Sequence, residues 1–220
     1  MKIDNKIIEE IKEKAKGFFV GASSCHGWSH VERVYNLSLK IAKGEKADIS
    51  VVKIASYLHD IGRREEMRSK GKICHAEKGV ELAEKILAKY SLGEVTKENI
   101  LHCILSHRYR NDHVPKTIEA KIIFDADKLD SIGAVGVGRD FFFAGNIGSV
   151  LYSGNEKKLV KNAREYSYTK EDSALLEYYF KLKNVKSKIL TRTGKKIAEK
   201  RHNYMVNFFK KFESEVKGLS

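Results

Sequence analysis

Residues 51–63 read VVKIASYLHDIGR, and this stretch decides the fold class. Its apolar residues recur at the spacing of a buried helix rather than in the strict alternation of a half-buried strand. Asp48 or Ser50 is a suitable N-cap for that helix. The helix ends on an imidazole and a carboxylate, those of His59 and Asp60, directly behind a strongly apolar segment.

Helical spacing continues on both sides of this stretch, and the chain's single proline, Pro115, leaves nearly all of it free to be helical. Ser29 with Glu32 reads as a capping box, and Thr96 as a further N-cap. The segment 63–72 is polar and predicts a loop, with Gly62 at the preceding helix end. Further helices are predicted from residue 3 and over about 29–42, 75–90, 96–105, 117–132, 173–182 and 193–212.

The fold class predicted is therefore all-α, in a single domain over residues 1–220. Its core covers about residues 22–145, and a C-terminal helical extension covers about 155–220. The glycine-rich segment 133–154 is the only plausible subdomain boundary. A strand over Ile122–Phe124 is the alternative that the sequence leaves open locally.

Composition limits the class of protein. The three cysteines have no CxxC spacing, the N-terminus lacks a signal-peptide core, and no apolar run reaches 18 residues. We therefore expect a cytoplasmic protein without disulfides and without a membrane span.

The net charge of +13 is unevenly distributed. Residues 181–220 hold 12 Lys and Arg against 3 Asp and Glu, so this tail alone carries +9. Such a tail suggests nucleic acid, an anionic membrane surface or an anionic substrate as partner. A solvated lysine-rich helix face is the interpretation we favour.

Three motifs contain residues that could bind a metal ion or take part in catalysis: HGWSHVERV at 26–34, LHDIGR at 58–63 and FDADKLD at 124–130. His30 and Arg33 are three residues apart and share one helix face. Asp60 follows an apolar run, where burial of an unpaired carboxylate would cost free energy. A bound metal ion would remove that cost. Two imidazoles and two carboxylates suit Mn²⁺ first, with Fe²⁺, Zn²⁺, Ni²⁺, Co²⁺ or Mg²⁺ as alternatives.

The combination HxxRV, HDIG and DADKLDSIGAVGVGR resembles the HD superfamily of metal-dependent phosphohydrolases, over roughly residues 22–145. It looks closest to bacterial and archaeal HD hydrolases of this length, some of which resemble nucleotide pyrophosphohydrolases. The resemblance implies an HD-type helical bundle. One departure is Gly27, which follows His26 where close relatives often carry HD. The metal ligands that the resemblance implies are His30, His59, Asp60 and Asp127.

The same resemblance places Arg33 and Lys128 near substrate phosphate. Arg63 or Arg108 is a further candidate for neutralising the charge on the phosphoryl group. The order of histidines also occurs in two-metal branches of the superfamily. His75 and His107 therefore either hold a second ion, bind phosphate or lie behind a one-metal site, which is the arrangement we favour. Glu65 or Glu66, or one of these two histidines, is the candidate general acid.

The function expected is hydrolysis of a phosphoester or phosphoanhydride by a metal-activated water, on a small phosphorylated substrate such as a nucleotide. Two alternatives stay open. One is a di-iron oxygenase on an HD fold. The other is a nucleic-acid-binding or regulatory module with a vestigial site, an alternative that the basic tail suggests. The sequence does not decide the substrate, the number of ions or the oligomeric state.

Overall fold

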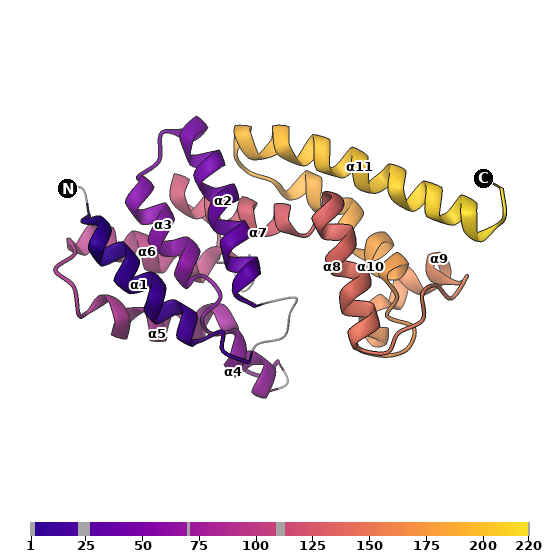
Figure 1. Cartoon of the computed structure of the whole chain (residues 1–220), viewed down its shortest axis with the longest axis horizontal. Helices are drawn as coiled ribbons and strands as arrows, with labels where there is room; N and C mark the ends of the chain where they lie inside the picture. Colours follow the sequence, from indigo (N-terminus) through magenta and orange to yellow (C-terminus); the bar gives the residue numbers. More distant parts are fainter. Residues whose placement is uncertain (1–2, 22–26, 70, 109–112, 220) are drawn as a thin grey trace. The chain divides into compact units, whose positions relative to one another are not determined.

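The computed structural model describes residues 3–21, 27–69, 71–108 and 113–219. These residues form helices and connecting loops without a strand, so the all-α prediction is confirmed, and residues 122–124 are helical (Figure 1). The helices are α1 (Asn5–Gly17), α2 (Trp28–Glu45), α3 (Ile49–Leu58), α4 (Arg63–Arg68), α5 (His75–Leu87), α6 (Glu94–Ser106), α7 (Ile118–Asp130), α8 (Gly133–Asn146), α9 (Glu156–Leu159), η1 (Val160–Tyr166), α10 (Ala174–Phe180), η2 (Leu182–Lys188) and α11 (Arg192–Val216).

The chain forms two compact units. The first contains residues 1–127 and the short segment 190–194, and the second contains residues 128–189 and 195–220. The division falls inside α7 rather than in the glycine-rich segment 133–154, whose first part forms α8. The single domain over residues 1–220 stays a prediction.

In the first unit, α3 is the central helix and packs against α1, α2 and α6. Every residue of α3 from Val51 to Leu58 is buried except Lys53. Asp48 caps this helix, as predicted, by accepting hydrogen bonds from the amides of Ser50 and Val51. The apolar surroundings of α3 hold its C-terminal end, and hence His59, in the interior.

The segment 190–194 joins the first unit through Asp125, a fully buried residue of α7. The Asp125 carboxylate accepts hydrogen bonds from the Leu190 amide at 2.8 Å and from the Thr191 amide at 2.7 Å. The Thr191 hydroxyl donates a third at 2.6 Å. Asp125 thus fixes the start of α11 to the helix that carries Asp127.

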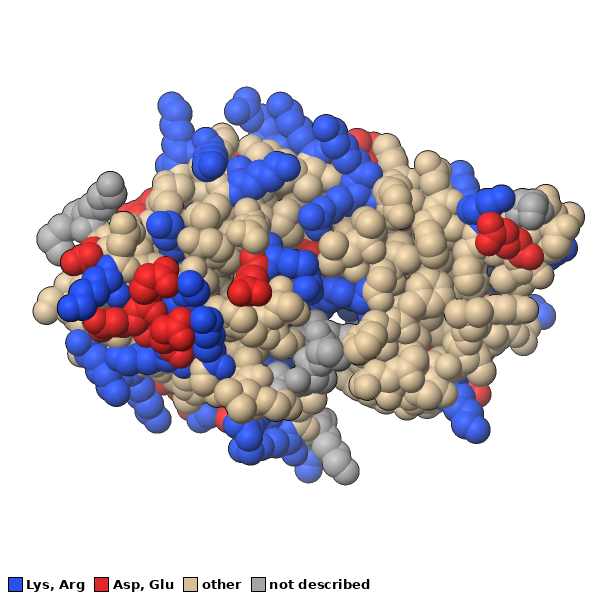
Figure 2. All heavy atoms as spheres, viewed as in Figure 1, with Lys and Arg blue, Asp and Glu red and all other residues tan. Residues whose placement is uncertain are grey.

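The second unit is held by aromatic packing between α8, α10 and α11. Phe141, Tyr178, Phe208, Phe209 and Phe212 form this cluster, with Tyr178 stacked on Phe209 at 4.2 Å between ring centroids. Figure 2 shows few charged side chains on the visible face of the α8–α10 region.

Three local predictions are wrong. Helix α2 begins at Trp28 after Gly27, without a side-chain cap, so Ser29 and Glu32 form no capping box. Helix α6 begins at Glu94, two residues before Thr96. The polar segment 63–72, predicted as a loop, begins with α4.

Gly62 lies before α4 rather than at the end of α3, and its backbone is pressed against α5. A Cβ at this position would lie 2.3 Å from the His75 carbonyl oxygen and 2.7 Å from the Gly79 amide nitrogen. Only glycine allows this approach without a shift of backbone. The HDIG turn is therefore fixed directly onto the helix that carries His75. No helix in the described part of the chain is both long and apolar enough to cross a bilayer.

Candidate metal centre

Six predicted site residues meet inside the first unit. His30 lies on α2, His59 and Asp60 follow the last turn of α3, His75 opens α5, His107 follows α6, and Asp127 lies on α7. All are buried except Asp127, whose side chain is 17% exposed. The six side chains form two donor groups, and the atoms within each group lie within 4.8 Å of one another.

The first donor group is His30, His59 and Asp127. The Nε2 atoms of the two histidines are 3.3 Å apart, and the Asp127 Oδ1 lies 3.4 Å from the His30 Nε2. Asp127, rather than Asp125, contributes the carboxylate, because Asp125 is engaged by residues 190 and 191.

The second donor group is Asp60, His75 and His107. The Asp60 Oδ1 lies 3.4 Å from the Nε2 atom of each histidine, and these two nitrogens are 3.1 Å apart. From the sequence we favour one ion, with a second ion at His75 and His107 as the alternative. The structure gives these two histidines the same kind of geometry as the predicted ligands.

Asp60 lies between the two groups. Its Oδ2 is 3.7 Å from the His30 Nε2 and 3.9 Å from the His59 Nε2, while its Oδ1 faces the second group. The Arg63 guanidinium donates to both oxygens at 3.0–3.2 Å and so fixes the plane of the carboxylate. One carboxylate is thereby presented to two potential cation positions.

The protonation of His59 and His107 follows from their second nitrogens. The His59 Nδ1 lies 2.8 Å from the Ser56 carbonyl oxygen, and the His107 Nδ1 lies 2.6 Å from the Ile104 carbonyl oxygen. A carbonyl oxygen only accepts, so each Nδ1 carries the proton. In the neutral imidazole the Nε2 then has a lone pair, and that lone pair points into the centre.

Burial lowers the pKa of His59 to about 4, and the neighbouring imidazoles oppose its protonation while Asp60 favours it. Burial likewise lowers the pKa of His75 to about 4, against the hydrogen bond to Glu66. Although burial alone would raise it, the Arg63 charge and the surrounding histidines hold the pKa of Asp60 well below its usual range. Near neutral pH these groups are neutral imidazoles and an ionised carboxylate, the forms that bind metal.

These donors fit divalent cations. The Nε2 atoms of the two histidine pairs are 3.3 and 3.1 Å apart. Two imidazole nitrogens that both carry lone pairs at this distance repel unless a cation lies between them. Imidazole nitrogens combined with carboxylate oxygens suit Mn²⁺, Fe²⁺ and Zn²⁺.

The other predicted site residues lie on helices that carry or follow the donors. Arg33 is half-buried on α2, one turn beyond His30. Lys128 is half-buried and follows Asp127 on α7. Glu65 is half-buried on α4, and its buried Oε2 has no hydrogen-bond partner among the described residues. His26 lies outside the described residues.

Glu66, rather than Glu65, is bound into the centre. Its carboxylate contacts the His75 Nδ1 at 2.8 Å and the Arg63 Nη1 at 2.9 Å, and it also accepts from Arg108. Burial would raise the pKa of Glu66, but the His75 hydrogen bond and the two guanidinium charges lower it to about 2. Arg63 and Arg108 are therefore paired with carboxylates in this structure rather than offered to a substrate.

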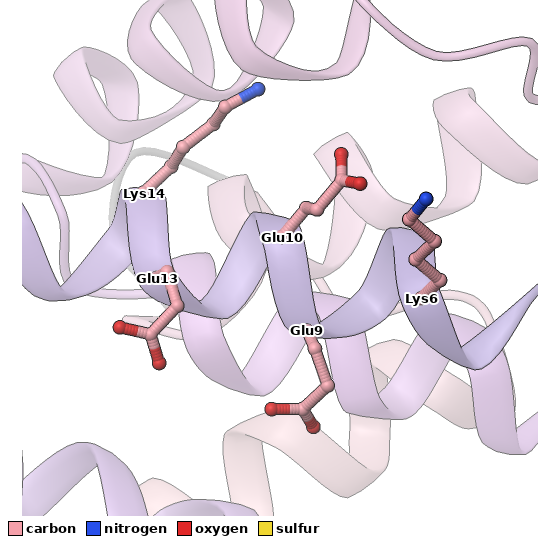
Figure 3. Close-up of a pocket in the computed structure, with 5 residues that line it drawn as sticks. All are labelled: Lys6, Glu9, Glu10, Glu13 and Lys14. Atoms are coloured by element: carbon pink, nitrogen blue, oxygen red, sulfur yellow. The ribbon is translucent and has the colours of Figure 1, made fainter.

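The pocket in Figure 3 lies elsewhere in the first unit. Its lining comes from the charged face of α1, namely Lys6, Glu9, Glu10, Glu13 and Lys14. Glu9 and Glu13 form ion pairs with Lys12 and Lys16 on the same helix. No predicted site residue lines this pocket.

Comparisons with known proteins agree with the histidine and aspartate pattern. The family model described as the HD domain matches residues 27–132. The protein YpgQ of Bacillus subtilis is 30% identical over 218 residues, which cover 97% of this chain and 96% of YpgQ. The chain belongs to the HD superfamily.

Solved structures are similar over nearly the whole chain. Bacillus subtilis YpgQ, solved in complex with ADP, is 26% identical with a TM-score of 0.72 over 97% of each chain. An HD-superfamily hydrolase of Bacillus thuringiensis is 25% identical with a TM-score of 0.73, over 97% of this chain and 98% of that one. Both units of this HD protein thus have counterparts in known structures.

Proposed function

We propose that this HD protein is a metal-dependent phosphohydrolase that cleaves a phosphoester or phosphoanhydride of a nucleotide. The observation that carries the proposal is the convergence of Nε2 atoms and carboxylate oxygens in two adjacent donor groups. The ADP bound to YpgQ supports a nucleotide as the substrate class.

His30, His59 and Asp127 would hold one ion, with Asp60 shared between this position and that of His75 and His107. A bound divalent cation, Mn²⁺ first among the candidates, would lower the pKa of a water and polarise a phosphoryl oxygen. The contribution of the protein is a set of donors whose orientation is fixed before an ion binds. The Nδ1–H groups of His59 and His107 are anchored to backbone carbonyls, and Arg63 fixes Asp60.

The charge of the phosphoryl group also needs neutralisation. Arg33 lies one turn beyond His30 and would bind phosphate oxygens, and Lys128 keeps the same predicted role. Glu66 is ionised and held by three donors, so it does not supply a proton to the leaving group. Glu65 remains the candidate general acid.

The experiment is a hydrolysis assay over nucleoside mono-, di- and triphosphates with Mn²⁺, on the wild type and Asp60→Ala. Glu81→Ala is the control, because Glu81 is exposed on α5 and pairs only with Lys78 among the contacts described. We expect activity in the wild type and the control, and loss of activity and of bound metal in Asp60→Ala. Full turnover and metal content in Asp60→Ala would contradict the proposal.

Two adjacent donor groups also agree with the di-iron oxygenase alternative. Metal analysis separates the two functions. Two iron atoms per chain after aerobic purification, with oxygen consumption and no phosphate release, would favour the oxygenase.

A further inference from the structure

Glu66 collects three hydrogen-bond donors on one carboxylate. The Arg63 Nη1 donates to its Oε2 at 2.9 Å, Arg108 donates to its Oε1, and the His75 Nδ1 lies 2.8 Å from Oε2. Its side chain is 13% exposed, so water supplies little of this solvation. The residue lies on α4, the short helix that follows the HDIG turn.

The contact with His75 fixes where the proton of that imidazole resides. An ionised carboxylate only accepts hydrogen bonds, so the contact requires a proton on the His75 Nδ1. The Nε2 then keeps its lone pair, which faces the Asp60 Oδ1 at 3.4 Å and the His107 Nε2 at 3.1 Å. His59 and His107 use backbone carbonyls for this purpose, whereas His75 depends on a side chain.

The charge of Glu66 matters as well. Two guanidinium groups, those of Arg63 and Arg108, lie next to the second donor group, and the Arg108 Nη1 is 3.2 Å from the His75 Nδ1. These positive charges would repel a cation held by Asp60, His75 and His107. The Glu66 carboxylate offsets them at contact distance.

We infer that Glu66 is a positioning residue that prepares the second donor group for a divalent cation. It acts by setting the tautomer of His75 and by offsetting the charges of Arg63 and Arg108. This inference rests on the proposed function only for its consequence in catalysis. The binding of the ion and the tautomer can be measured without turnover.

Two substitutions separate the two effects. Glu66→Gln keeps an oxygen that accepts from the His75 Nδ1 but removes the charge, and Glu66→Ala removes both. Glu81→Gln is the matched control, a carboxylate exchanged on the helix of His75 and outside the centre. Melting curves check that each variant is folded.

The first measurement is Mn²⁺ binding by the full chain, followed by calorimetry and by electron paramagnetic resonance of bound Mn²⁺. We expect the weaker Mn²⁺ step to lose roughly 10–100-fold in affinity in both Glu66 variants and to stay unchanged in Glu81→Gln. Equal affinities in Glu66→Gln and the wild type would overturn the charge effect.

The second measurement is the imidazole ¹⁵N spectrum of metal-free protein, with the His75 signals assigned by their loss in His75→Asn. We expect the Nδ1–H form of His75 in the wild type and in Glu66→Gln, and a population of the Nε2–H form in Glu66→Ala. An unchanged tautomer in Glu66→Ala would overturn the positioning role, even if the protein hydrolyses nucleotides. Normal metal binding and tautomer without hydrolysis would instead contradict the proposed function alone.

Discussion

The neutral state of the buried histidines predicts how the metal-free protein responds to acid. Folding lowers the pKa of His59 from its ordinary value of 6.5 to about 4. Below pH 6.5 the unfolded chain therefore takes up a proton at this residue, whereas the folded protein does so only near pH 4. The free energy of unfolding is therefore unaffected by this residue above pH 6.5 and falls as the pH is lowered from 6.5 to about 4.

The size of the effect follows from the pKa values. At pH 5 the unfolded chain is 1.5 pH units below the ordinary histidine pKa of 6.5. Each unit corresponds to about 1.4 kcal/mol. Keeping His59 neutral in the folded protein therefore lowers the free energy of unfolding by about 2 kcal/mol at this pH. The variant His59→Asn removes the titrating nitrogen, while its amide can still donate to the Ser56 carbonyl.

The assay is urea unfolding of wild type and His59→Asn at pH 8, 7 and 5 in EDTA, followed by the fluorescence of Trp28. This residue is the chain's single tryptophan, and its ring stacks on Tyr57 at 5.9 Å, so it reports on the first unit. From pH 7 to pH 5 we expect the wild type to lose about 2 kcal/mol more than the variant. Between pH 8 and pH 7 the difference between the two proteins should be constant.

A result of the opposite sign would refute the reasoning. If His59 were a cation paired with Asp60 in the native protein, its folded pKa would be raised, and the wild type would resist acid better than the variant. The same outcome would remove the lone pair on which the proposed metal centre depends. Identical pH dependence in both proteins would also contradict the lowered pKa.

Three further predictions concern stability. Burial and the nearby Glu177 raise the pKa of Asp140, whose Oδ2 has no hydrogen-bond partner among the described residues, so its ionisation destabilises the second unit as the pH rises. Asp140→Asn should therefore be about 1–3 kcal/mol more stable at pH 8, with no advantage below pH 4, by urea unfolding followed by tyrosine fluorescence. Gly62→Ala should lower the free energy of unfolding by about 1–3 kcal/mol in urea titrations, because its Cβ meets the backbone of α5, whereas Gly17→Ala has open space and should be neutral. Asp125→Ala removes the acceptor of three donors, two of them in buried hydrogen bonds, and should cost about 3 kcal/mol or more in thermal unfolding, and an unchanged melting temperature would contradict its anchoring role.

The sequence predicted the helical class well because apolar spacing records which face of each helix is buried. It predicted the ends of helices less well. Helix α4 follows a glycine that is pressed against α5. The polar sequence 63–72, which predicts a loop, gives no sign of this tertiary contact. Helix α2 begins without the expected side-chain cap, although Ser29 and Glu32 have the right spacing.

The centre was predictable in its residue types but not in its grouping. Helical spacing does not reveal that the two oxygens of Asp60 face different histidine pairs. The choice between Glu65 and Glu66 was also out of reach, because adjacent helical residues diverge by about 100° and only the packing of α4 decides which one meets His75. Arg63, a candidate for substrate phosphate, is paired with Asp60 because α4 begins directly after the HDIG turn.

The return of residues 190–194 to the first unit sets an order on the synthesis of the protein. All six donors of the centre have left the ribosome once α7 has emerged, but the partners of Asp125 lie 65 and 66 residues further along the chain. At about 5–20 residues per second, translation needs roughly 3–13 s more before those partners exist. During that interval the Asp125 carboxylate, on the helix that carries Asp127, lacks the backbone donors of Leu190 and Thr191. A nascent chain stalled before residue 190 would thus contain every donor but lack the partners of Asp125, so the anchoring of α7 follows the synthesis of the donors.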